Sequence, residues 1–271
     1  MDKYVVIGNP IKQSKSPFIH QAFALQTKQQ MDYEKVLVPT DSFVSYIRHF
    51  QELGGKGCNV TLPFKEEAFQ IADSLSERAK AAGAVNTLIF NTDGTILGDN
   101  TDGQGLVGDI LAQGVVIKGA RVLLIGAGGA ARGCILPLQH QQPKEIVIVN
   151  RTQNKAQALA QEFNSVGNII SSDMSSIDGK FDIVINSTSA SLSGELPAIS
   201  EHVIASANCC YDMAYGNEDT SFLVWAKKLG VPKTIDGLGM LVGQAAESFR
   251  LWRGVTPATE LVLKQLRNGL N

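Results

Sequence analysis

Residues 120–133 read ARVLLIGAGGAARG, and this stretch decides the fold. The apolar run before Gly126 predicts a buried strand, the glycines predict a turn, and the residues after them predict a helix. A dinucleotide-binding fingerprint of the form GxGxxA requires this context. Gly126 permits the tight turn, Gly128 lets the backbone approach a pyrophosphate, and Ala131 keeps the helix close to the strand. The alternative is an ordinary strand-to-helix turn, but both flanks favour nucleotide binding.

The end of the next predicted strand, EIVIVN at 145–150, indicates which nucleotide binds. An enzyme that uses NAD usually has an acidic residue about 20 residues past the fingerprint, where it binds the ribose 2′-hydroxyl. This chain has Asn150-Arg151-Thr152 there, followed by Lys155. A guanidinium suits a 2′-phosphate through paired, charge-assisted hydrogen bonds. We therefore expect NADP as the cofactor, the alternative being a helix start with two solvated cations.

Short apolar runs alternate with helical patterns along most of the chain, which is typical of α/β proteins with parallel strands. The predicted strands are 4–8, 33–38, 57–61 and 87–90, then 122–125, 145–150, 181–188 and 208–213. Ser16 is expected to cap a helix that Pro17 opens, Asp41 to cap the next, and Pro257 to begin the last one. A Leu-, Val- and Ile-rich helix near 102–105 is expected to join two α/β lobes, with a ligand-binding cleft between them.

Composition excludes several classes of protein. The chain has 271 residues, 44% of them hydrophobic, and a formal net charge of -2, so we expect a globular protein that does not bind nucleic acid. No apolar run approaches the ~20 residues that span a bilayer, and the N-terminus lacks the pattern of a signal peptide. We expect a cytoplasmic protein without membrane association. The four cysteines show no zinc-ligand spacing, so no metal site is expected.

Three polar clusters lie next to predicted elements and indicate a second site. The stretch Asn59-Val-Thr61-Leu-Pro-Phe-Lys65 starts as a strand, breaks at its proline and ends on a lysine. Residues 100–103, Asn-Thr-Asp-Gly, open the joining helix, and residues 14–16, Ser-Lys-Ser, stand near a helix N-terminus that suits a carboxylate. Lys65 alone would be read as an exposed residue of a first helical turn. The clusters together suggest that it has a chemical role.

A series of motifs runs from end to end of the chain: GNPIKQSKSPFIH, NVTLPFKE, GAVNT, GDNTDG, GAGGAARG, NRT, NSTS, YDM and GLGMLVGQAAESFRLWRG. With these motifs the chain resembles the shikimate dehydrogenase family, the NADP-dependent enzymes of aromatic amino-acid (chorismate) biosynthesis. The resemblance implies an N-terminal α/β substrate lobe completed by C-terminal helices, and an inserted Rossmann-like NADP lobe. The implied domains are 1–101 plus 238–271 for substrate and 102–237 for NADP.

The resemblance also implies residue roles. Lys65 and Asp102 match the family's acid–base pair in the reversible reduction of 3-dehydroshikimate to shikimate. Matches to the substrate ligands are Ser14 and Ser16 for the carboxylate, Thr61, Asn86, Asp102 and Gln244 for the ring hydroxyls, and Tyr215 near the carboxylate end. Matches to the NADP site are Gly126, Ala127, Gly128, Gly129, Ala130, Asn150, Arg151, Thr152 and Lys155, with Met213 and Gly237 beside the nicotinamide and Glu77 at a cofactor-proximal position.

Two positions depart from the family's pattern. Ser191 replaces a glycine in the loop expected under the nicotinamide ribose, and Thr220-Ser221 stands where Thr-Pro is usual. Neither departure involves the acid–base pair. We therefore expect them to affect the conformation of the loop and not the activity.

Two rival functions are compatible with these motifs. A quinate/shikimate dehydrogenase with broader substrate use often favours NAD, which Arg151 argues against. An NADP-binding sensor without activity would keep the glycine turn and lose the acid–base pair, yet Lys65 and Asp102 are both present. The expected partner is a small-molecule substrate, and the chain is expected to be a monomer or a homodimer.

Overall fold

The structure is a computed structural model, and it describes residues 1–270. Contacts between residues divide the chain into two compact units, each with its own six-stranded sheet. Unit 1 comprises Met1–Gly105 and Val242–Leu266, and unit 2 comprises Leu106–Leu241 together with α11 from Arg267 on. The domain boundaries expected from the sequence, at 101 and 237, stay a prediction.

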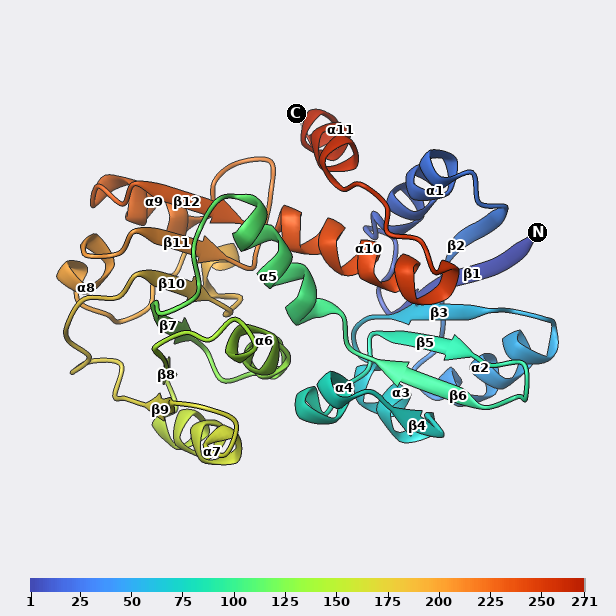
Figure 1. Cartoon of the computed structure of the whole chain (residues 1–271), viewed down its shortest axis with the longest axis horizontal. Helices are drawn as coiled ribbons and strands as arrows, with labels where there is room; N and C mark the ends of the chain where they lie inside the picture. Colours follow the sequence, from blue (N-terminus) through green and yellow to red (C-terminus); the bar gives the residue numbers. More distant parts are fainter. Residues whose placement is uncertain (271) are drawn as a thin grey trace. The chain divides into compact units, whose positions relative to one another are not determined.

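Unit 1 is a mixed sheet with helices packed against it (Figure 1). Its strand order is β2-β1-β3-β5-β6-β4. The strands are β1 Asp2–Gly8, β2 Met31–Leu37, β3 Gly57–Val60, β4 Ser74–Leu75, β5 Thr87–Phe90 and β6 Ile96–Asp99. The helices are α1 Ser16–Thr27, α2 Phe43–Glu52, α3 Lys65–Ile71, α4 Glu77–Ala82 and most of α10 Leu238–Arg253, followed by the start of α11 Glu260–Leu270.

The expectation of parallel strands is wrong for part of unit 1. Strand β5 pairs antiparallel with both β3 and β6. The segment Asn91–Thr95 joins β5 to β6 as a tight turn, in which Thr95 donates to Asp93. A parallel pair would need a crossover of about a dozen residues, so this short connection forces a hairpin. The hairpin brings Asn86, just before β5, beside Asp99 at the end of β6, because Asn86 N–H donates to the Asp99 carbonyl at 3.0 Å.

Unit 2 is an all-parallel sheet in the order β12-β11-β10-β7-β8-β9, which is the doubly wound order of dinucleotide-binding folds. The strands are β7 Arg121–Ile125, β8 Glu145–Val149, β9 Ile169–Ser171, β10 Ile183–Asn186, β11 Cys209–Asp212 and β12 Lys233–Asp236. The helices are α5 Asp102–Ala112, which begins in unit 1, α6 Gly129–Gln139, α7 Gln153–Phe163, α8 Glu201–Ala205 and α9 Ser221–Lys228, with the 3-10 turn η1 Ala190–Ser193. The predicted α/β fold is confirmed.

Each unit has its own hydrophobic core. In unit 1 the ring of Phe43 stacks on that of Phe64 at 4.8 Å between centroids, which ties α2 to the start of α3. In unit 2 the central strands β7 and β10 are buried except at Arg121, the first residue of β7, and the buried rings of Phe181 and Phe222 belong to the core that they form. All four cysteines, Cys58, Cys134, Cys209 and Cys210, are buried.

Three predicted helix ends are wrong by a few residues. The N-cap of α1 is Lys15 instead of Ser16, because the Ser14 hydroxyl already accepts the Ser16 N–H at 3.3 Å. The N-cap of α2 is Ser42, and Asp41 accepts the Ser42 hydroxyl. The last helix begins at Glu260, three residues after Pro257, since Ala258 N–H bonds to the side chain of Gln26 and keeps this segment outside the helix.

Candidate functional site

Lys65 and Asp102 form an ion pair in unit 1. Lys65 is the first residue of α3 and Asp102 the first of α5, so both chain segments turn at this point. Lys65 Nζ lies 2.6 Å from Asp102 Oδ2. The side chains are 28% and 19% exposed, so the pair is sheltered but still accessible to a small molecule. The structure thus brings together the lysine and the aspartate that the sequence singled out.

Asn86 holds the other oxygen of the Asp102 carboxylate. Its side-chain oxygen accepts the Thr101 backbone N–H at 2.9 Å, and a backbone N–H can only donate. Asn86 Nδ2 must therefore face the opposite way, where it donates to Asp102 Oδ1 at 2.7 Å. The orientation of the amide is set by the backbone, and Asp102 receives one donor on each oxygen.

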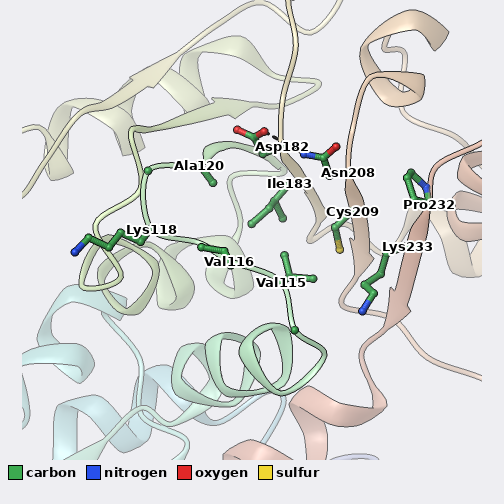
Figure 2. A pocket seen from close by; sticks show the side chains of 12 residues that line it. Val115, Val116, Lys118, Ala120, Asp182, Ile183, Asn208, Cys209, Pro232 and Lys233 are labelled. Atoms are coloured by element: carbon green, nitrogen blue, oxygen red, sulfur yellow. Dashed lines mark hydrogen bonds between the residues drawn. The ribbon is translucent and has the colours of Figure 1, made fainter.

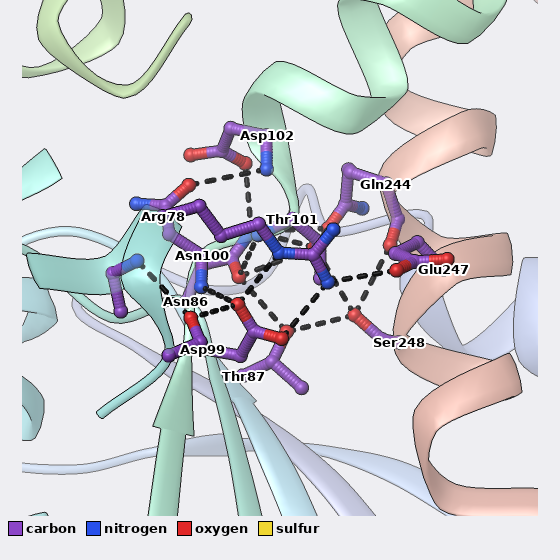
Figure 3. Close-up of polar contacts among 12 residues, drawn as sticks. Arg78, Asn86, Thr87, Asp99, Asn100, Thr101, Asp102, Gln244, Glu247 and Ser248 are labelled. Atoms are coloured by element: carbon purple, nitrogen blue, oxygen red, sulfur yellow. Dashed lines mark hydrogen bonds and ion pairs between the residues drawn. The ribbon is translucent and has the colours of Figure 1, made fainter. Parts of the chain in front are cut away.

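A buried polar network supports Asn86 (Figure 3). Ser248, on α10, lies within hydrogen-bonding distance of the hydroxyls of Thr87 and Thr101, at 2.8 and 3.2 Å. Asn59 donates to Ser248 Oγ at 3.0 Å and accepts the Tyr33 hydroxyl at 2.7 Å. Sequence reasoning placed Thr101 in a polar cluster but gave it no role, and it missed Ser248. The available signal was a polar residue in an otherwise apolar strand or helix face, and Asn59 in GCNV is the clearest case.

Gln244 connects α10 to the same cluster. Its Oε1 lies 3.4 Å from Asn86 Nδ2 and 3.5 Å from Thr101 Oγ1. Both distances are at the long end of the hydrogen-bonding range, so these two contacts are weaker than the others in the cluster. The predicted catalytic residue Lys65 and the predicted substrate residues Asn86, Asp102 and Gln244 are therefore linked to one another.

Ser14, Ser16 and Thr61 belong to the same unit and follow β1 and β3. Ser16 is buried and Ser14 half-buried at the N-terminus of α1, where backbone N–H groups favour an anion. Thr61 follows β3 and its N–H donates to the Ile7 carbonyl at 2.9 Å. A Cβ at Gly8 would lie 2.5 Å from Thr61 Cγ2, so the glycine of GNPIKQSKSP allows this close approach.

The fingerprint of unit 2 has the geometry of a phosphate cradle. Gly126 has φ +112°, which other residues rarely adopt, and a Cβ there would lie 2.4 Å from Ser187 Oγ. Gly128 and Gly129 have open space where a Cβ would point, and both lie at the start of α6. Ala131 is fully buried, as expected for the residue that packs the helix on the strand.

A cavity of about 460 Å³ opens at the carboxyl ends of β7, β8 and β10. This is the edge at which open α/β sheets bind their ligands. Of the predicted cofactor residues, Gly126, Ala127, Gly128, Asn150 and Arg151 line it. Residues 187–190, from the loop that the sequence placed under the nicotinamide ribose, also line it, and so do Met174, Ser193 and residues 195–198, which sequence reasoning missed. Gly129, Ala130, Thr152 and Lys155 belong to the adjoining starts of α6 and α7.

Arg151 is exposed and lies just after the end of β8. The residues that follow β8 and line the cavity are Asn150 and Arg151, and neither is acidic. Asn150 Nδ2 donates to the Thr152 carbonyl at 2.9 Å and so shapes the turn that presents Arg151. A dinucleotide with a 2′-phosphate fits this donor set, since the cavity supplies backbone N–H groups for a pyrophosphate and a guanidinium for a further phosphate.

Both departures from the family's pattern meet near one buried carboxyl group, that of Asp212. Thr220 Oγ1 donates to Asp212 Oδ2 at 2.6 Å, and burial raises the pKa of Asp212. Asn186 Nδ2 donates to Asp212 Oδ1 at 3.2 Å. Ser191 is buried beside this group, and its carbonyl accepts the Ser221 hydroxyl at 3.1 Å. The two unusual serines therefore bond to each other.

The remaining predicted residues lie as follows. Met213 and Gly237 are in contact, because a Cβ at Gly237 would lie 2.0 Å from the Met213 carbonyl oxygen. Tyr215 is half-buried in unit 2, and burial raises its pKa. Glu77 stands at the start of α4 in unit 1. Tyr215 and Glu77 thus belong to the opposite units from the residues with which they were grouped, and their roles stay predictions.

A second cavity, of about 540 Å³, lies at the amino ends of the strands of unit 2 (Figure 2). Asp182, Cys209 and Lys233 line it. Lys233 donates to the Gln113 carbonyl, and burial raises the pKa of the Cys209 thiol to about 12. A thiol with a raised pKa is a poor nucleophile, so this cavity offers no evident chemistry.

The described residues offer neither a metal centre nor a membrane span. In residues 1–270, no group of three or more His, Cys, Asp or Glu side chains is arranged to hold a metal ion. None of the helices that the structure describes has the length and apolar character needed to cross a membrane.

Comparisons with known proteins match the whole chain. Three family models match successive segments: the shikimate dehydrogenase substrate binding domain over 6–88, shikimate / quinate 5-dehydrogenase over 110–206, and the shikimate 5'-dehydrogenase C-terminal domain over 237–267. A shikimate dehydrogenase (NADP(+)) from Photobacterium profundum is 58% identical, over 98% of this chain and 98% of its own.

Solved structures agree with these matches. An Ael1 enzyme from Pseudomonas putida has a TM-score of 0.95 and 46% identity, with 98% of both chains covered. The shikimate 5-dehydrogenase from Thermus thermophilus, in complex with NADP(H) and shikimate, has a TM-score of 0.88 and 29% identity, with 100% of both chains covered.

Proposed function

The chain belongs to the shikimate dehydrogenase family, and on this premise we propose that it catalyses the reversible, NADP-dependent reduction of 3-dehydroshikimate to shikimate, with Lys65 as acid and base and Asp102 as its partner. The observation that carries the proposal is the contact between Lys65 Nζ and Asp102 Oδ2 at 2.6 Å. It places a proton-bearing group beside a carboxylate in an accessible position.

The chemistry requires one proton for each hydride. NADP supplies the hydride in reduction, as NADPH, and accepts it in oxidation. In reduction, the ammonium of Lys65 gives a proton to the carbonyl oxygen of the substrate. In oxidation, the neutral amine takes the hydroxyl proton back. Asp102 orients Lys65 through Oδ2 and can accept a hydrogen bond from a substrate hydroxyl.

The substrate is a polyhydroxy acid, and unit 1 offers suitable partners for each part of it. The hydroxyls of Ser14 and Ser16, beside the N-terminus of α1, suit the carboxylate. Neutral groups suit the ring hydroxyls because they donate and accept without a net charge, and these are the side chains of Thr61, Asn86 and Gln244. The bonds to Asn86 hold its amide in one orientation before substrate arrives.

The cofactor residues are those at the carboxyl ends of β7 and β8. Gly126 and Gly128 allow the backbone to approach the pyrophosphate, and Arg151 pairs with the 2′-phosphate. This proposal also includes a cytoplasmic location and a monomeric or homodimeric state.

Steady-state kinetics with shikimate test the proposal, using NADP and NAD in parallel and quinate as a competing substrate. Lys65→Met keeps much of the side-chain length and removes the amine. General acid–base catalysis contributes about 10²–10⁴-fold, so we expect kcat to fall by that order while direct titration shows shikimate binding little changed. Lys80→Met, on the exposed face of α4, is the matched control and should leave kcat unchanged.

Other outcomes would point elsewhere. A Lys65→Met protein with near-normal kcat, or one that loses only binding, would show that Lys65 does not transfer the proton. A wild-type protein that prefers quinate and NAD would support a broader dehydrogenase. Binding of NADP without turnover of either acid would support a sensor.

A further inference from the structure

Arg78 on α4 joins two carboxylates that come from different elements of unit 1. Its Nε and Nη2 donate to Asp99 Oδ1 and Oδ2 at 2.7 and 2.8 Å. Nη2 also donates to Glu247 Oε1 at 2.7 Å. Figure 3 shows this guanidinium between the end of β6 and helix α10. The Arg78 side chain is 19% exposed and that of Asp99 only 5%, so this is a largely buried ion pair.

The bond to Asp99 controls the turn that bears Asp102. Asp99 Oδ1 accepts the Asn100 backbone N–H at 2.7 Å, and Asn100 Oδ1 in turn accepts the Asp102 N–H at 3.2 Å. The Asp99 carboxylate therefore determines the path of the chain from the last residue of β6 to the first residue of α5. Arg78 holds this carboxylate with two parallel bonds, which restrict its rotation as well as its position.

The bond to Glu247 controls the helix that bears Gln244. Glu247 stands three residues after Gln244 and one before Ser248, so all three lie within about one turn of α10. Arg250 also pairs with Glu247, at 2.8 and 2.9 Å, but it does not bond to Asp99. Arg78 is thus the residue that ties the α10 carboxylate to the turn after β6.

We propose that Arg78 is a positioning residue for the reaction, because it holds Asp102 and Gln244 in register on either side of Asn86. Asp102 Oδ1 and Gln244 Oε1 lie 2.7 and 3.4 Å from the same Asn86 nitrogen. A shift of the turn or of α10 would separate these groups, although Arg78 acts on them only through Asp99 and Glu247. This inference rests on the proposed function, which makes Asp102 and Gln244 ligands of the substrate.

Lysine cannot replace arginine in this position. Its ammonium is a single point charge, whereas the planar guanidinium reaches both oxygens of Asp99 and a third oxygen on Glu247. Arg78→Lys therefore keeps the positive charge that Asp99 needs for burial and loses the geometry. A misplacement of about 1 Å in an active site can lower the rate about 10²-fold.

The test compares wild type, Arg78→Lys and a control, Arg250→Lys, in the same shikimate assay. For Arg78→Lys we expect kcat/KM for shikimate to fall about 10–100-fold, with the KM for NADP and the thermal unfolding midpoint close to wild type. Arg250 is the more exposed of the two arginines that pair with Glu247, because the Arg250 side chain is 44% exposed. Arg250→Lys should therefore keep kcat/KM within a factor of about two.

Chemical rescue provides a second measurement that a purely structural role would not produce. Arg78→Ala leaves room for a small cation, so guanidinium chloride well below denaturing concentrations should restore part of kcat/KM. Sodium chloride at the same ionic strength should not. If Arg78→Ala does not fold, the Arg78→Lys comparison alone decides the question.

The outcomes separate this inference from the proposed function. An active wild type with an equally active Arg78→Lys would overturn the positioning role only. A parallel loss of NADP affinity or of thermal stability would also overturn it, since Arg78 would then stabilise the fold in general. A wild type that does not oxidise shikimate with NADP would overturn both.

Discussion

His20 gives a prediction for stability against pH. Its ring is fully buried in unit 1 and stacks on Tyr33, with centroids 4.1 Å apart. Neither ring nitrogen has a hydrogen-bond partner among the described residues. Burial lowers the pKa of His20 from 6.5 to about 3, because the charged form would lose its hydration. The folded protein therefore keeps this histidine neutral.

The direction of the effect follows from proton linkage. Below about pH 6.5 the unfolded chain takes up a proton at this position, and the folded chain does not do so until pH falls to about 3. Above about pH 6.5, His20 therefore does not reduce the free energy of unfolding. As pH falls below this value, His20 lowers that free energy progressively. One pKa unit corresponds to about 1.4 kcal/mol, so about 2 kcal/mol of unfolding free energy is lost between pH 7.5 and about pH 5.

The measurement is urea unfolding at both pH values for wild type and for His20→Phe, which keeps a stacking ring and removes both nitrogens. Trp252, whose ring lies 5.4 Å from His20, reports on unit 1, and a Trp225→Phe background removes the signal of unit 2. The titration of buried carboxylates alters the unfolding free energy of wild type and of His20→Phe equally. Only the difference between the two losses is therefore attributed to His20. Wild type should lose about 2 kcal/mol more than the variant. Equal losses in wild type and variant would refute the reasoning. The pKa of His20 would then be the same in the folded and unfolded states, or a group in the folded protein would stabilise its charged ring.

Three further predictions concern the two sites. Arg151→Ala should weaken NADP binding about tenfold to a hundredfold with little effect on NAD, and equal losses in titrations of both would make Arg151 structural. Ser14→Ala with Ser16→Ala should raise the KM for shikimate and leave the NADP dissociation constant nearly unchanged, whereas a large loss of NADP affinity would contradict that placement. Gly126→Ala should abolish NADP binding, because the φ of +112° disfavours a side chain and its Cβ would lie 2.4 Å from Ser187 Oγ; calorimetry showing normal binding would contradict the cradle.

The fold of unit 2 could be predicted from the sequence because its signals are local. VLLI before Gly126 and IVIV before Asn150 are continuous apolar runs, as expected of strands buried on both faces. Unit 1 was harder. Strand β4 has only two residues, and β6 has the sequence ILGD, so neither contains enough residues to show a period. The antiparallel pairing follows from the short Asn91–Thr95 turn, which can be recognised as a hairpin only once β6 is known to be a strand.

The site could be predicted only in part, because its supporting groups come from distant segments. The polar clusters around Lys65 and Asp102 stand out locally, and the family resemblance gave them roles. Arg78 shows no such signal: ERAKAA reads as an ordinary exposed helix. Its partners Asp99 and Glu247 are 21 and 169 residues away, so only the folded structure reveals the link.

The segment GDNTDG contains two aspartates, and the structure distinguishes their tasks by their partners. Asp99 Oδ1 accepts bonds from Ser76, Arg78 and Asn100, and its side chain is 5% exposed. A carboxylate oxygen has two lone pairs, so this one has no capacity left for a ligand. Each oxygen of Asp102 accepts one of the bonds described above, and its side chain is 19% exposed. Asp102 therefore keeps a lone pair on each oxygen for a substrate hydroxyl. Asp99 keeps one only on Oδ2, which Arg78 covers in a side chain that is 5% exposed, so Asp99 holds the turn.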